Sequence, residues 1–214
     1  MADTASSARG MLVSANLDAL ARLLPPPQES VAAPPWERSK AECGFDFPAD
    51  YREFVNRYGG GTILTGSREW APVWVLAPCS VPWKPGGPSG FKAFVEKAAS
   101  LPLEHEANSW DGPAYPDLPV AGGLLAWGHN QDGDTFYWST EHSDPDRWPV
   151  VMLARGPAAV LPFEGGMVEF LLAVYNGEHI ASQWTADPVL RWTMESDWLR
   201  DGLQISAGPS YERG

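Results

Sequence analysis

Basic residues are missing from a long internal stretch of this chain. No lysine or arginine occurs between Ala98 and Asp146, and over all 214 residues 15 Lys and Arg face 27 Asp and Glu, a formal charge of −12. A surface of this sign repels phosphate backbones from most directions. We therefore expect no nucleic acid partner.

Cysteines and long apolar runs are also scarce. The two cysteines, Cys43 and Cys79, are too few for a disulfide framework, and the first twenty residues contain no apolar core of a signal peptide. No run of about 18 apolar residues is present, so we predict no membrane span and a cytoplasmic location. Apolar residues still make up 44% of the chain, including 11 tryptophans, which is enough to build a hydrophobic core.

The spacing of apolar residues and the positions of prolines and glycines predict the secondary structure. A first helix is expected to begin behind the caps Ser14 and Asn16, after a frayed start, and to end at the proline run 25–27. Further helices are predicted over 36–43, 48–58, 90–100, 167–175 and 188–199. Strands are predicted in TILTG, APVWVLAP and WPVVMLA, with a hairpin around Asp132-Gly133.

The stretch FPADYREFVNRYGGGTIL shows how one such boundary is built. Pro48 suits the first helical position, Gly59 can adopt the positive φ that stops a helix, and Gly60 lets the chain turn into the next strand. A phosphate-binding loop needs the opposite order, strand before helix, and usually a lysine. The glycine run is therefore interpreted as structural.

Helices at both ends of a central run of strands predict an α+β fold. We expect an N-terminal helical extension and Pro-rich linker over 1–32, a main domain over 33–178, and a helical tail over 179–214 that packs on it.

Four blocks follow one another along the chain. The first is Trp36, Gly44, Pro48, Asp50, Tyr51 and Phe54 followed by YGGG, and the others are LLAWGHNQDGDTFYW, DPDRWPVV and EFLLAVYNG. In this order they resemble the SUKH superfamily, which includes the fungal Smi and Knr cell-wall regulators. The resemblance implies a mixed, mainly antiparallel sheet wrapped by helices. It also implies that bacterial members bind and silence a polymorphic toxin as immunity proteins, with a Smi/Knr-type regulatory scaffold as the alternative. The motif positions predicted to be structural are Trp36, Gly44, Pro48, Tyr51, Phe54, Gly59, Gly60, Trp127, Trp138 and Trp148.

The four histidines are the first candidates for catalytic or metal-binding residues. The spacing of His105, His129, His142 and His179 matches no zinc pattern. Carboxylates on either side of Gly133 are expected to point into water from a type I′ turn, and no nucleophile elbow is present. We therefore predict no catalytic residue, metal or cofactor; a metal- or acid/base-dependent hydrolase is the remaining enzyme alternative.

The acidic stretch between Ala98 and Asp146, which has no lysine or arginine, is the predicted binding surface. Toxins that act on nucleic acid present basic grooves, which an acidic inhibitor can occupy, so we expect a basic protein partner. The predicted contact residues are Glu104, Glu106, Trp110, Asp111, Asp117, Asp132, Asp134, Glu141, Asp144 and Asp146.

Overall fold

A computed structural model describes most of the chain. The described residues are 2–65, 70–78, 90–99, 111–113, 115–116, 121–130, 132–156, 158–179 and 189–195. Of the predicted contact residues, Glu104, Glu106, Trp110 and Asp117 lie outside these ranges.

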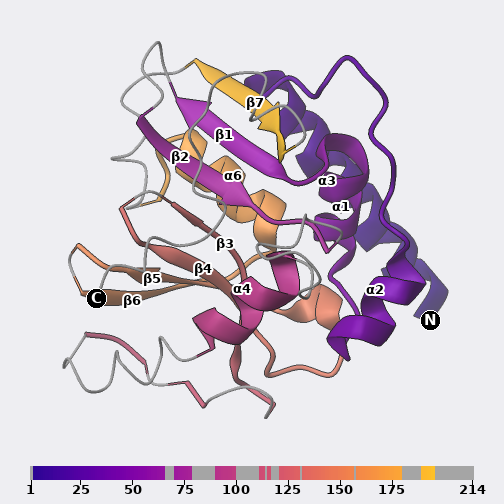
Figure 1. The fold of residues 1–214 in the computed structure, drawn as a ribbon. Helices are drawn as coiled ribbons and strands as arrows, with labels where there is room; N and C mark the ends of the chain where they lie inside the picture. Colours follow the sequence, from indigo (N-terminus) through magenta and orange to yellow (C-terminus); the bar gives the residue numbers. More distant parts are fainter. Residues whose placement is uncertain are drawn as a thin grey trace.

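In the described ranges, seven strands form one sheet, in the order β6-β5-β4-β3-β2-β1-β7. Every neighbouring pair of strands is antiparallel. Figure 1 shows the strands side by side from β7 to β6. The strands are β1 Gly61–Thr65, β2 Trp70–Val75, β3 Leu124–Asn130, β4 Thr135–Ser139, β5 Val150–Ala154, β6 Ala159–Phe163 and β7 Leu190–Met194.

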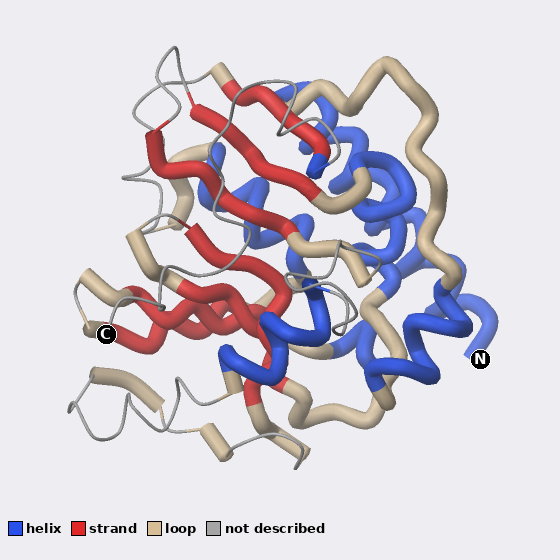
Figure 2. The backbone as a smooth tube through the Cα atoms, viewed as in Figure 1, coloured by secondary structure: helices blue, strands red, loops and turns tan. Residues whose placement is uncertain are grey.

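Helices cover both faces of this sheet, which makes the fold α+β as the sequence predicted. Figure 1 shows α6 behind the strands and α4 in front, and Figure 2 shows the other helices gathered along one side. The helices are α1 Ala2–Leu23, α2 Trp36–Cys43, α3 Ala49–Tyr58, α4 Gly90–Ala98 and α6 Met167–Tyr175, with a 3-10 turn, η1, at Pro145–Arg147.

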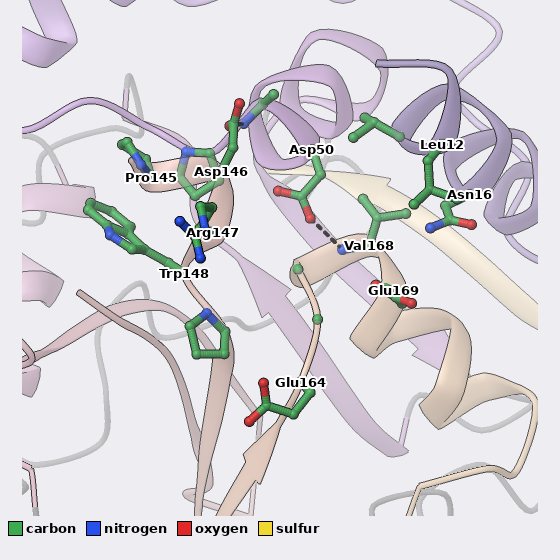
Figure 3. Close-up of a pocket in the computed structure, with 16 residues that line it drawn as sticks. Leu12, Asn16, Asp50, Pro145, Asp146, Arg147, Trp148, Glu164, Val168 and Glu169 are labelled. Carbon is green, nitrogen blue, oxygen red and sulfur yellow. Dashed lines mark hydrogen bonds between the residues drawn. The ribbon is translucent and has the colours of Figure 1, made fainter. Parts of the chain in front are cut away.

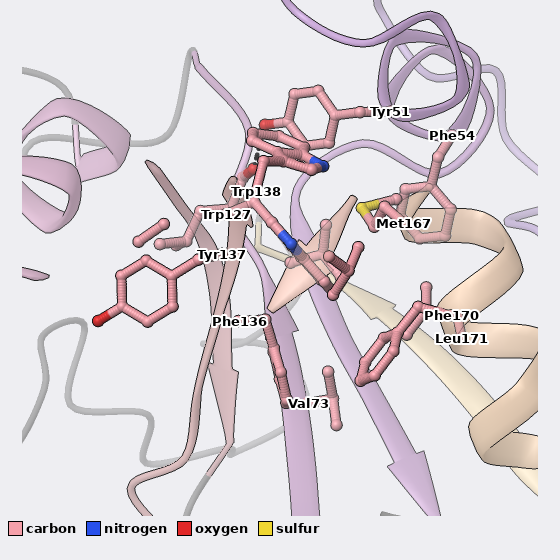
Figure 4. Packing of buried hydrophobic residues seen from close by; sticks show 14 of the residues in the cluster. Tyr51, Phe54, Val73, Trp127, Phe136, Tyr137, Trp138, Met167, Phe170 and Leu171 are labelled. Atoms are coloured by element: carbon pink, nitrogen blue, oxygen red, sulfur yellow. Dashed lines mark hydrogen bonds between the residues drawn. The ribbon is translucent and has the colours of Figure 1, made fainter. Parts of the chain in front are cut away.

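Alternation along β4 assigns its side chains to the two layers. On one face, Phe136 lies 5.7 Å from the ring of Phe170 on α6, and Trp138 lies 5.0 Å from the ring of Tyr51 on α3. On the other face, the Tyr137 hydroxyl donates to the carbonyl oxygen of Ala98 at the end of α4. Figure 4 shows the aromatic core between the sheet and α6.

The N-terminal helix belongs to this core and is longer than predicted. It begins at Ala2, so Ser14 and Asn16 lie inside it and do not cap it. Its second half packs on α3 and α6, with Leu17, Leu20 and Leu24 buried along its inner face and just beyond its end. Once that half is docked, each earlier residue adds one hydrogen bond without a new nucleation cost. No proline interrupts residues 2–13, so the helix continues to Ala2.

The glycine run after α3 has the predicted structural role. Gly59 caps the helix with φ +76°, and its N–H donates to the carbonyl oxygen of Val55. A Cβ on Gly61 would lie 2.3 Å from the carbonyl oxygen of Thr193, because β7 approaches the backbone of β1 closely. Pro48 was predicted to be the first helical residue, but it is the N-cap of α3, and the helix begins one position later, at Ala49.

The helix predicted over 188–199 is wrong at 190–194, which form strand β7. The apolar stripe suited a helix, but all five residues pair with β1. Trp192 packs against the rings of Phe54 and Tyr58, and its Nε1–H donates to the carbonyl oxygen of Tyr58. Long-range pairing and packing have overridden the local preference.

Strand β6 was not predicted from the sequence and lies at the edge of the sheet. Pro162 interrupts its pattern, and proline is tolerated in edge strands. The backbone of Asp111 covers part of this edge: its N–H donates to Ala158, and its carbonyl accepts from Val160. With Val160 bonded and Pro162 lacking an N–H, the outer edge offers a new strand few donors.

Candidate functional site

The described part of the predicted acidic surface is divided between two ends of the sheet. The β3–β4 hairpin carries Asp132 and Asp134 at one end of β4, and Asp111 lies beside Ala159 at the start of the edge strand β6. The loop after β4 carries Glu141, Asp144 and Asp146 at the other end. A strand rises about 3.3 Å per residue, which places the two groups roughly 20 Å apart. They therefore form two separate surfaces instead of one.

At the hairpin end, Asp134 is a structural residue, and its prediction as a partner contact is wrong. Its side chain is buried; it accepts from the Nδ2 of Asn130 at 2.7 Å and from the backbone N–H of Arg155 at 2.7 Å. Burial raises the pKa of Asp134, against the lowering effect of these hydrogen bonds. Because the carboxylate points inward and accepts from both residues, it ties the hairpin to the turn after β5.

The hairpin turn itself is also not of the predicted type I′. That type needs positive φ at both central residues, but Asp132 does not have it. Among the turn residues that the structure describes, Gly133 is the one in the left-handed region, at φ +88°, and its N–H donates to the carbonyl oxygen of Asn130. This end is also less acidic than predicted, because the Arg155 side chain lies against Gly133.

At the opposite end, a pocket of about 250 Å³ lies where α1, α3, η1 and the start of α6 meet. Figure 3 shows that acidic side chains from distant parts of the sequence surround it. Asp146 was predicted from the sequence; Asp50, Glu164 and Glu169 join it. Glu141 and Asp144 belong to the loop that leads into η1.

The pocket is held together by a carboxylate that reaches across the fold. Asp50, in the first turn of α3, accepts from the backbone N–H of Val168 in the first turn of α6, at 3.1 Å (Figure 3). The N-cap of α6 is Gly166, which has no side chain to cap the helix. A Cβ on Gly166 would lie 2.4 Å from the Oδ2 of Asp50. The glycine thus leaves room for a cap supplied from another helix.

A second carboxylate caps α3 from η1. The Oδ1 of Asp146 accepts from the backbone N–H of Ala49 at 2.6 Å. Asp146 is itself positioned because its N–H donates to Asp144, the cap of η1. The N-termini of both α3 and α6 are therefore occupied by carboxylates of the chain itself, which the helix dipole stabilises.

Arg147 is the one lysine or arginine among the residues that line the pocket. Arg147 contributes the guanidinium, and one of its nitrogens contacts the Nε2 of His142. Trp148 forms an apolar wall and donates from Nε1 to the carbonyl oxygen of His142 at 2.5 Å.

The carboxylates create a negative field at this end. Burial raises the pKa of Asp50, with Asp146 adding to the rise, although N–H donors of Val168 and Tyr51 oppose it. Burial, with the nearby charges of Glu141 and Glu164, raises the pKa of Tyr115. Within the described ranges, ion pairs lie within α2, within α4 and between α1 and α3, and Asp46 in the connection after α2 pairs with Lys40 and Arg52. None of these pairs includes Asp146, Glu164 or Glu169.

The described residues contain no group of three or more His, Cys, Asp or Glu side chains that could hold a metal ion. His129, one of the histidines considered from the sequence, stacks on Trp74 at 4.7 Å and faces Phe94 at 5.3 Å. Burial lowers the pKa of His129 to about 4. It is therefore a neutral packing residue at pH 7. His105 lies outside the described residues.

The motif residues taken as structural are found in the core or at turns. Trp127, Trp138, Tyr51 and Phe54 are buried, as is most of Trp148. Trp36 is half-buried and donates from Nε1 to Asn56 at 2.9 Å. Gly44 ends α2 with φ +83°.

Comparison with protein-family models, with curated proteins and with solved structures returns no match for this chain. In the described part of the chain, none of the helices has the length and apolar character needed to cross a membrane.

Proposed function

We propose that this chain is a non-enzymatic binding protein of the SUKH type, which neutralises a cognate polymorphic toxin by binding it. One observation carries the proposal. At the end of the sheet that holds the pocket, here called the pocket end, Asp146, Glu164 and Glu169 surround a concave surface. They form no ion pair with another described residue. Carboxylates arranged in this way attract a basic protein surface and speed its capture.

The same surface supports binding better than catalysis. The carboxylates in the first turns of the helices are committed to backbone N–H groups, Asp50 to Val168 and Asp146 to Ala49. A hydrolase would need a nucleophile, a base or a metal facing a reacting atom. No specific observation favours a Smi/Knr-type regulatory scaffold over an immunity protein.

Co-expression with the product of the neighbouring gene tests the proposal, scored by growth of the host. The expected result is that the neighbouring gene alone arrests growth, that this chain restores it, and that the two purified proteins form a complex. An unrelated toxin serves as the control and should still arrest growth. A harmless neighbouring product, or rescue without complex formation, would contradict the proposal.

A further inference from the structure

The pocket at the N-termini of α3 and α6 has a size and a lining that indicate what it binds. Its volume of about 250 Å³ is below the roughly 300–1,000 Å³ of typical small-molecule sites. A single long side chain fills such a space better than a drug-sized ligand does. Its walls include apolar groups of Trp148 and Val168, while Glu164 and Glu169 are exposed.

Two exposed apolar side chains, Met11 and Leu12, lie beside the pocket. Leu12 on α1 lines the pocket and is 57% exposed, and its neighbour Met11 is 68% exposed. In the described part of the chain, the large apolar side chains that are exposed are these two and Val189. Large apolar groups beside a concave surface are typical of the centre of a protein interface, and single exposed ones are common elsewhere.

The charges that line the pocket favour binding of a cation over binding of an anion. Helix N-termini normally attract anions, but here Asp50 and Asp146 already accept from the backbone N–H groups of Val168 and Ala49. Even without Asp50, whose pKa is raised, three carboxylates face the one guanidinium of Arg147. Lysine and arginine combine an apolar stem with a charged head, which matches apolar walls below exposed carboxylates.

We propose that this pocket receives a lysine or arginine side chain from a basic segment of a protein partner, with Met11 and Leu12 contacting apolar groups beside it. The proposal rests on the proposed function for the identity of the partner as a toxin, but the chemistry of the pocket can be tested alone. Glu164 and Glu169 hold the cationic head, and Trp148 packs against the stem.

The test uses the full chain and two probes of nearly equal shape, N-acetyl-arginine amide and the neutral N-acetyl-citrulline amide. Binding is followed by ¹H–¹⁵N NMR at the Val168 amide and the Trp148 indole. We expect the arginine probe to shift both signals at millimolar concentration and the citrulline probe to leave them unchanged. The double variant Glu164→Gln/Glu169→Gln should weaken arginine binding about threefold or more, because it removes two charges.

The matched control is Glu37→Gln/Asp132→Asn, which removes two exposed carboxylates that do not line the pocket and should leave arginine binding unchanged. Equal shifts with both probes, or equal effects of the two double variants, would overturn the proposal. A pocket that ignores arginine in a chain that still rescues growth overturns this inference alone. A pocket that binds arginine in a chain that binds no toxin overturns the proposed function alone.

Discussion

The carboxylate of Asp50 lies 3.1 Å from the backbone nitrogen of Val168, 118 positions later in the sequence. This bond joins the first turn of α3 to the first turn of α6, and both residues line the acidic pocket. Gly166 is part of the same arrangement, because any Cβ there would displace the carboxylate.

Asp50 and Gly166 should therefore depend on each other in a double-mutant cycle. Asp50→Ala should lower the free energy of unfolding by about 1–2 kcal/mol through loss of the cap. Gly166→Ala should cost a similar amount, although its φ of −78° suits alanine. In the Asp50→Ala background, Gly166→Ala should cost little or become favourable, since the clash is gone and the unfolded chain is restricted. Urea unfolding of the four proteins measures this coupling, and additive effects would contradict it.

The hairpin carboxylates Asp132 and Asp134 should differ sharply despite being two residues apart. Asp134→Ala should destabilise by about 1–3 kcal/mol, because it leaves buried donors of Asn130 and Arg155 without their acceptor. Asp132→Ala, at an exposed position, should change stability by about 0.5 kcal/mol or less. Thermal unfolding of both variants tests the assignment. Equal melting temperatures would show that Asp134 does not tie the hairpin to the β5–β6 turn.

His129 should make the protein less stable as the pH falls from about 6.5 toward 4. Its folded pKa of about 4 lies below the unfolded value near 6.5. The unfolded chain therefore takes up the proton first, and its contribution to stability, complete above 6.5, is lost on acidification. The loss should be about 1–2 kcal/mol between pH 7 and 5.

His129→Phe is the matched variant, because it keeps a flat ring between Trp74 and Phe94 but cannot titrate. Subtracting its stability curve removes the opposite contributions of Asp50 and Asp134, whose raised pKa values favour the folded state at lower pH. Parallel curves for the wild type and the variant would mean that the histidine is not buried in its neutral form.

Local signals in the sequence were sufficient for much of the fold. The helix from Ala49 to Tyr58, its stop at Gly59 and the β3–β4 hairpin follow from spacing and punctuation that act over a few residues. Strand β7 could not be predicted in this way, because its pairing with β1 outweighs a helical stripe.

The site was harder to predict for the same reason. Asp146 was named because it belongs to a conspicuous acidic run, whereas Asp50 and Glu169 meet it only after α3 and α6 have packed together. One signal was available: Gly165-Gly166 precedes a strongly apolar helix without any capping side chain, which indicates that a cap comes from elsewhere. Asp134 was wrongly predicted to be exposed, because a carboxylate beside a hairpin glycine usually points into water. Its burial is explained by the hydrogen bond from the backbone N–H of Arg155, which is distant in the sequence.

The most direct test of the central claim is the association rate with the cognate toxin at low salt. The variant Glu164→Lys/Glu169→Lys reverses charge at the pocket end, and Asp132→Lys/Glu37→Lys reverses as much charge elsewhere. All four positions are exposed, so both proteins should fold with little loss of stability. We predict that the first variant binds about tenfold more slowly or worse and that the second changes the rate much less, with the difference shrinking as salt screens the charges. Equal slowing by both variants, or slower binding by the second, would contradict the placement of the binding surface at the pocket end.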